Sequence, residues 1–344
     1  MDILDNQNVI AQRDPQDALG VATGQCDYFS VSFDATFTPS SEVKNIVWAG
    51  IGGSALPMVV VQSWPQTTIP FEIVRNYEIP PYVGENTLFV VSSYSGNTEE
   101  TLEALTHAEE KGAQIVIVAA GGKLMDIAKE KSYPLFVIPA GIQPRMATFY
   151  FVSAFVSIVH ELNVTFYDVN ELAQVGEWLR EQIKNWASTV PSEHNYAKQL
   201  ALQLMGKTTV MYAGPKLYPA ANKWKICMNE NAKNTAWANQ YPEFNHSEFI
   251  GWSSHPVEKP FAVVEIRSSL EHERVQKRFE VTERLLSGMR PAPIVIVPQG
   301  DTLLQELAWS FALGDFVSIY LGILNGVNPT PVELVEKLKA ELAK

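Results

Sequence analysis

The stretch from Ser92 to Thr101 reads Ser-Ser-Tyr-Ser-Gly-Asn-Thr-Glu-Glu-Thr, and together with its flanks it decides the fold class. It follows the apolar run 87–91 and precedes residues 102–108, where apolar side chains recur at helical spacing, so we predict a strand, a turn and a helix. A helix start offers free backbone N–H groups and a positive dipole end, and the hydroxyls here add donors, so this turn is predicted to bind phosphate. The alternative is an ordinary N-cap, although a cap needs one hydroxyl and this turn has several.

Mostly apolar segments alternate with helical stretches along the chain, as is typical of a parallel sheet covered on both faces. In the first half these segments lie at 46–49, 71–74, 88–91, 115–119 and 135–138. The second half repeats the order with weaker copies at 208–214, 261–266 and 293–297, which suggests an internal duplication. The predicted fold class is therefore α/β, with two tandem doubly wound parallel-sheet domains. We expect residues 1–165 to form the first domain, with an N-terminal extension, and residues 166–344 to form the second, with connecting helices.

Composition describes a folded globular protein. Hydrophobic residues make up 46% of the 344 residues and charged residues 19%. The formal net charge of −12 argues against nucleic acid or an anionic membrane as a partner. The acidic amino terminus lacks the pattern of a signal peptide, and the longest uncharged run, 45–71, is broken by glycine and proline, so no membrane-spanning helix is expected. Two lone cysteines fit a reducing compartment, and we expect a cytoplasmic protein.

Two turns in the first half of the chain could bind a ligand, and they allow two interpretations. Residues 50–55, Gly-Ile-Gly-Gly-Ser-Ala, match a dinucleotide-binding fingerprint, but the acidic residue expected after the second strand is replaced by Arg75 and Asn76. A phosphate or sugar loop uses both turns, because the carboxyl ends of parallel strands lie at one edge of the sheet. The hydroxyl-bearing and small residues of these turns are Gly53, Ser54, Ser93, Ser95 and Thr98.

Residues 224–252 are the richest in chemistry-bearing side chains. Glu230 stands between two asparagines, and His246 follows among aromatic residues. A carboxylate that abstracts a carbon-bound proton and a histidine that handles oxygen-bound protons suit proton transfer beside a carbonyl. A solvated helix end for Glu230 and a packing role for His246 are the alternatives. The six histidines show no metal-ligand spacing with each other or with the cysteines, so no metal site is expected.

Four motifs in this order resemble the bifunctional phosphoglucose/phosphomannose isomerases, which are two-lobed sugar isomerase (SIS) proteins. They are Gly-x-Gly-Gly-Ser, Ser-Tyr-Ser-Gly-Asn-Thr-Glu-Glu-Thr, Asn-Glu-Asn-Ala-Lys and Pro-Glu-Phe-Asn-His-x-Glu, and the similarity runs from about residue 45 to the end. The resemblance implies two tandem SIS domains and a homodimer with shared active sites. It also implies interconversion of glucose 6-phosphate, and of mannose 6-phosphate, with fructose 6-phosphate, without metal or nucleotide cofactor.

The resemblance also assigns roles by motif. Gly53, Ser54, Ser93, Ser95 and Thr98 would hold the sugar phosphate. Glu230 would move a proton between C1 and C2 through a cis-enediol intermediate, and His246, from the neighbouring subunit, would assist ring opening.

The resemblance also implies catalytic roles for two positively charged residues. Arg145 resembles an arginine that stabilises the enediolate charge. A lysine of the last helix would act at the ring oxygen. Lys339 is preferred over Lys337 because it lies nearer the apolar stripe formed by Val332, Val335, Leu338 and Leu342.

Two other functions remain open from the sequence. A catalytically silent SIS protein would use the same pocket as a sugar-phosphate sensor, although the presence of both Glu230 and His246 argues against it. An SIS enzyme of other chemistry, such as amino-sugar phosphate formation or cleavage, would bring a glutaminase domain or a Schiff-base lysine, and the chain has no room for the former.

Overall fold

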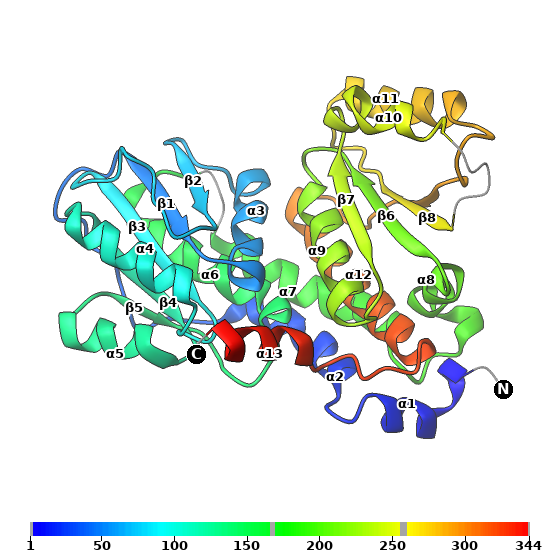
Figure 1. Cartoon of the computed structure of the whole chain (residues 1–344), viewed down its shortest axis with the longest axis horizontal. Helices are drawn as coiled ribbons and strands as arrows, with labels where there is room; N and C mark the ends of the chain where they lie inside the picture. The colour runs from blue at the N-terminus through cyan, green and yellow to red at the C-terminus, as the bar shows by residue number, and fades with distance from the viewer. Residues whose placement is uncertain (1–2, 166–168, 255–259, 343–344) are drawn as a thin grey trace. The chain divides into compact units, whose positions relative to one another are not determined.

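The computed structural model describes residues 3–165, 169–254 and 260–342 (Figure 1). The chain divides into two compact units. One consists of Gln25–Trp178, and the other combines Met1–Gly24 with Leu179–Lys344. The first residues therefore group with the second sheet. The predicted boundary after residue 165 stays a prediction, and residues 166–168 lie outside the described part of the chain.

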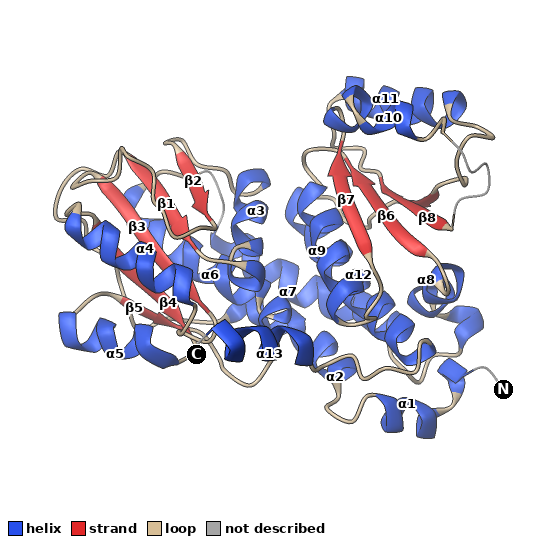
Figure 2. Ribbon diagram, in the orientation of Figure 1, coloured by secondary structure: helices blue, strands red, loops and turns tan. Residues whose placement is uncertain are grey.

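The unit Gln25–Trp178 is built on a five-stranded parallel sheet, of order β2-β1-β3-β4-β5 (Figure 2). Its strands are β1 (Asn45–Ala49), β2 (Phe71–Val74), β3 (Thr87–Ser93), β4 (Gln114–Ala119) and β5 (Leu135–Val137). Its helices are α3 (Leu56–Ser63), α4 (Glu99–Glu110), α5 (Gly122–Lys131) and α6 (Thr148–Val159), and α7 (Val169–Ile183) begins in it. The central strand β3 is buried at every residue, as expected for a strand covered on both faces.

Helices cover both faces of this first sheet. On one face, Phe89 and Ile117 pack with Leu105 of α4 and Leu124 of α5. On the other, the ring of Trp48 lies 6.2 Å from that of Phe155 in α6. The alternation of side chains along each strand sends neighbouring residues into two separate cores, which is the doubly wound arrangement predicted from the sequence.

The second unit carries a four-stranded parallel sheet of order β7-β6-β8-β9. Its strands are β6 (Thr208–Ala213), β7 (Ala236–Gln240), β8 (Phe261–Ile266) and β9 (Ile294–Ile296). Its helices are α1 (Gln7–Arg13), α2 (Ala18–Gly24), α8 (Tyr196–Leu204), α9 (Tyr218–Glu230), α10 (Glu248–Gly251), α11 (Glu273–Leu285), α12 (Leu303–Leu324) and α13 (Glu333–Leu342). The sequence predicted three of these strands and missed β7.

Helix α12 is the core of the second unit and packs against α8, α9 and α2. Within the described residues it is the helix long and apolar enough to cross a membrane, but 94% of its most apolar window is buried in the fold, as for a core helix. Lys223 of α9 and Asp315 of α12 form an ion pair at 2.8 Å with both side chains fully buried. Because a buried charge is costly without its partner, this pair favours a single register of α9 on α12.

Candidate functional site

The turns that follow β1 and β3 meet at one edge of the first sheet, as predicted. Gly53 and Ser54 lie in a 3₁₀ turn (Gly52–Ser54) directly after β1. Ser54 Oγ accepts a hydrogen bond from the Tyr94 N–H at 3.0 Å, and the Ser92 hydroxyl donates to the Ser54 carbonyl at 3.4 Å. These bonds join the two turns into one structure at the carboxyl ends of their strands, where open parallel sheets bind ligands.

Three hydroxyls of the second turn contact one another. Ser93 Oγ lies 2.7 Å from Thr98 Oγ1 and 3.4 Å from Ser95 Oγ, and it accepts from the Gly96 N–H at 3.1 Å. Thr98 holds the N-cap position of α4, yet its side chain makes no capping hydrogen bond. The ordinary N-cap interpretation therefore does not describe Thr98. Its hydroxyl belongs to a cluster at the start of a helix, where an anion is favoured.

Two glycines give this cluster its shape. Gly96 has φ +68°, and a Cβ there would lie 1.7 Å from the Gly121 carbonyl oxygen. A Cβ on Gly53 would lie 2.6 Å from the backbone carbon of Pro144. Neither position has room for a side chain, so both turns approach neighbouring backbone closely. We call the joined turns, with Gly53, Ser54, Ser93, Ser95 and Thr98, the hydroxyl cradle.

Arg145 lies next to the cradle. It belongs to a 3₁₀ turn (Pro144–Met146) that packs on the turn containing Gly53, and only 2% of its surface is exposed. Its guanidinium donates to Gln143 Oε1 at 3.3 Å. A buried guanidinium in a turn that packs on the cradle is suited to an anionic ligand, because its charge is permanent and its donors are fixed in one plane. The predicted phosphate residues and Arg145 are thus brought together in one unit.

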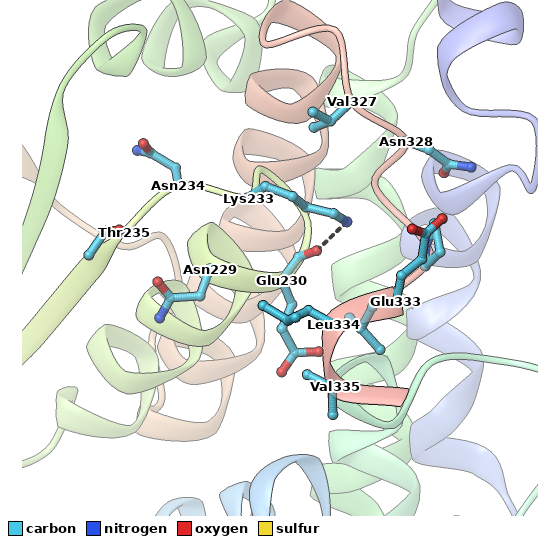
Figure 3. Close-up of a pocket in the computed structure, with 12 residues that line it drawn as sticks. Asn229, Glu230, Lys233, Asn234, Thr235, Val327, Asn328, Glu333, Leu334 and Val335 are labelled. Carbon is cyan, nitrogen blue, oxygen red and sulfur yellow. Dashed lines mark hydrogen bonds between the residues drawn. The ribbon is translucent and has the colours of Figure 1, made fainter. Parts of the chain in front are cut away.

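Glu230 lines a cavity of about 680 Å³ in the second unit (Figure 3). It is the last residue of α9 and is partly exposed. Figure 3 shows its carboxylate extending toward Leu334 and Val335 of α13. The other lining residues come from the end of α9, the start of β7 and the segment around α13: Asn229, Lys233, Asn234, Thr235, Val327, Asn328, Pro331, Val332 and Glu333.

His246 lies at the opposite end of β7 from Glu230. Helix α9 returns from the carboxyl end of β6 to the amino end of β7, so Glu230 lies where β7 begins. His246 is exposed and closes a 3₁₀ turn (Glu243–His246) beyond the carboxyl end of the same strand. At a rise of about 3.3 Å per residue, the strand alone separates the two by roughly 13 Å. The two residues are close in sequence, but one copy of the chain does not bring them together.

Lys339 lies on an exposed helix. Its ammonium pairs with Glu336 Oε1 at 2.8 Å, its side chain is 62% exposed, and it is not among the residues that line the Glu230 cavity. The apolar stripe that favoured Lys339 over Lys337 is itself exposed, at 45% for Val335, 58% for Leu338 and 67% for Leu342. The structure therefore gives no packing argument for either lysine, and the role of Lys339 stays a prediction.

In the second sheet, the turn between β6 and α9 is equivalent to part of the cradle, and a carboxylate of the same chain binds there. Glu271, after β8, accepts hydrogen bonds from the N–H groups of Lys216 at 2.8 Å and Leu217 at 3.4 Å, just before α9. Burial raises the pKa of this carboxyl, and the two N–H groups oppose the shift. This contact could not be predicted from the sequence, because it joins residues 54 positions apart.

Within the described residues, no group of three or more histidine, cysteine, aspartate and glutamate side chains is arranged to hold a metal ion.

Comparison with known proteins finds relatives that match most of the chain. Residues 193–342 match the family of the bacterial phospho-glucose isomerase C-terminal SIS domain. The chain is 32% identical to the bifunctional phosphoglucose/phosphomannose isomerase of Aquifex aeolicus, covering 88% of this chain and 91% of that protein. It is also 32% identical to the enzyme of the same name from Caldicellulosiruptor bescii, over 89% and 91% of the two chains.

The fold has counterparts among solved structures. A glucose-6-phosphate isomerase like protein from Thermus thermophilus superposes with a TM-score of 0.65 and 17% identity, covering 99% of each chain. The predicted tandem SIS fold is thereby confirmed, and the identity to the two enzymes above shows the family. The chain belongs to the bifunctional phosphoglucose/phosphomannose isomerases.

Proposed function

We propose that the protein interconverts glucose 6-phosphate, and also mannose 6-phosphate, with fructose 6-phosphate through a cis-enediol intermediate. The observation that carries the proposal is the hydroxyl cradle, in which Ser93 Oγ lies 2.7 Å from Thr98 Oγ1 at the start of α4 beside the buried Arg145. A phosphate ester is the ligand that such a helix start favours. Membership of the isomerase family supports the choice of reaction.

The proposed chemistry divides into binding and proton transfer. The cradle holds the phosphate, and Glu230 removes the proton from C2 of the open-chain aldose and returns it to C1. Arg145 stabilises the negative charge that develops on the enediolate oxygen, the role expected of a fixed cation. We assign the ring-oxygen contact to Lys339. The reaction is a proton shuttle within one sugar and uses no metal or nucleotide cofactor in this proposal.

His246 is proposed to open the sugar ring from a second copy of the chain, so that the active form is a homodimer with shared sites. The positions of Glu230 and His246 at opposite ends of β7 support this assignment, because ring opening and proton abstraction act on the same sugar. The proposed compartment is the cytoplasm, in keeping with the buried thiols of Cys26 and Cys227, which are not joined in a disulfide.

Proton exchange followed by NMR tests the reaction directly. Each hexose 6-phosphate is incubated in deuterated buffer with the wild type, with Glu230→Gln and with the control Glu130→Gln, which changes an exposed residue of α5. Deuterium is expected at C2 of the aldose with the wild type and the control, and not with Glu230→Gln, which still binds the sugar phosphate. Binding without conversion by the wild type would favour the sensor function, and full turnover by Glu230→Gln would exclude Glu230 as the base.

A further inference from the structure

Lys233 adopts a backbone conformation that is unfavourable for lysine. It follows the end of α9 with φ +52°, in the left-handed region where glycine or asparagine usually ends a helix. The Asn234 N–H donates to the Met228 carbonyl at 2.9 Å, so the chain turns sharply here. A side chain held in strained backbone at the edge of a cavity needs a compensating interaction.

The ammonium of Lys233 supplies that interaction. Its Nζ donates to the main-chain carbonyl of Glu230 at 2.7 Å (Figure 3). It also donates to the carbonyl of Pro329 at 3.2 Å. The Glu230 carbonyl is among the last of α9, where helical partners run out and a positive charge is favoured. The side chain of Lys233 therefore links the backbone of Glu230 to a segment around Pro329, which lies 96 residues after Lys233 in the sequence.

That segment forms the facing part of the cavity. Val327, Asn328 and Pro331 line it together with Glu230. Asn328 also receives support from the amino-terminal segment, because its side-chain amide lies 2.8 Å from Gln16 Oε1, and its own oxygen accepts from the Thr330 N–H at 3.1 Å. The segment is thus held on one side by Gln16 and on the other by Lys233, whose ammonium also reaches Glu230.

We propose that Lys233 is a positioning residue for the base: it fixes the main chain of Glu230 against the segment 327–331 and so sets where the carboxylate meets the sugar carbon. The inference rests on the proposed function. Figure 3 shows the carboxylate of Glu230 extending away from the Lys233 ammonium, and the bond drawn there is to the main-chain carbonyl, so this contact acts through the backbone. Proton abstraction depends on placement within a fraction of an ångström, and a misplacement of about 1 Å lowers the rate roughly 100-fold.

Glycine at this position separates positioning from folding. Lys233→Gly removes the ammonium and also removes the backbone strain, so its melting temperature is expected to stay at or above that of the wild type. We expect kcat to fall between about 10-fold and 100-fold while KM changes less than about 3-fold, because substrate binding is not what Lys233 provides. The kinetic isotope effect with glucose 6-phosphate deuterated at C2 is expected to rise, since proton abstraction becomes slower relative to binding and release.

Two further variants make the result specific. Ser132→Gly is the matched control, because Ser132 also has a left-handed backbone, at φ +58°, at the end of α5. It should have wild-type kcat. Lys233→Arg keeps a donor for both carbonyls and should restore part of the lost kcat.

The outcomes that overturn the proposal differ from those that overturn the reaction. Wild-type kcat in Lys233→Gly, or a raised KM with unchanged kcat, would exclude the positioning role while leaving the isomerase function intact. A wild type that converts no hexose 6-phosphate would instead remove the proposed function.

Discussion

Thr98 begins α4 with its hydroxyl directed to another hydroxyl, Ser93 Oγ at 2.7 Å, and not to the helix backbone. A residue that does not cap its helix is available for a ligand at little cost to folding. The strand, the turn and the helix start could be predicted because they are all local features of residues 87–108, whereas the contact between the two hydroxyls could not. Lys339 could not be fixed in the same way, because its environment depends on how α13 packs, and the described residues of α13 are all exposed.

Thr98→Val tests the cradle. Valine keeps the shape of threonine and removes one donor to a charged phosphate, a loss of about 1.5–3 kcal/mol. KM for each hexose 6-phosphate is therefore expected to rise roughly 10-fold to 100-fold with little change in melting temperature. The control Thr106→Val removes an exposed hydroxyl of the same helix, one that donates to the Leu102 carbonyl, and should leave KM unchanged. Equal KM values for both variants would contradict phosphate binding by Thr98.

At the scale of elements, β7 is the strand that the sequence pattern did not predict, and it separates Glu230 from His246. This strand, Ala-Trp-Ala-Asn-Gln, is short, partly exposed and at the edge of the sheet. It lacks the apolar run that identified the other strands. In the structure, Glu230 and His246 lie at opposite ends of this strand. The residue types were informative about the chemistry, but their placement depended on an element with a weak pattern.

Helix α12 carries a titratable group that should make stability depend on pH. Glu306 is only 4% exposed, and within the described residues its Oε2 has no hydrogen-bond partner. Burial raises its pKa above the ordinary 4.5, as does the Glu271 carboxylate, whereas Ser268 and Lys216 act in the opposite direction. A raised pKa means that the folded chain holds this proton more tightly than the unfolded chain does. Stability therefore falls as pH rises from about 4.5 through the raised value.

Glu306→Gln should remove this loss of stability. We expect the variant to be more stable than the wild type near pH 8, by on the order of 1 kcal/mol, because one pKa unit corresponds to about 1.4 kcal/mol. The gain should vanish near pH 4, where the wild-type carboxyl is also neutral. Denaturant unfolding across this pH range measures the difference, with Glu130→Gln as an exposed control. A variant less stable than the wild type at pH 8 would show that the charge of Glu306 stabilises the fold.

At the scale of the whole molecule, the two similar sheets carry different groups at the carboxyl ends of their strands. The first sheet presents hydroxyls at the carboxyl ends of its strands, whereas the equivalent turn of the second sheet binds the carboxylate of Glu271. The second unit instead offers Glu230 at one end of β7 and His246 at the other. The duplication was visible in the order of apolar segments. The division of roles was not, because it depends on contacts between residues far apart in the sequence.

Complementation between two inactive variants tests most directly whether the active site combines Glu230 of one copy of the chain with His246 of another. If the proposed homodimer with shared sites is the active form, Glu230→Gln and His246→Ala should each lack isomerase activity when purified alone. When equal amounts are unfolded together and refolded, half of the dimers are mixed, and each mixed dimer has one site with both Glu230 and His246 intact. We expect recovery of about a quarter of wild-type activity. A refolded mixture as inactive as either variant alone would contradict a site that takes Glu230 from one copy of the chain and His246 from another.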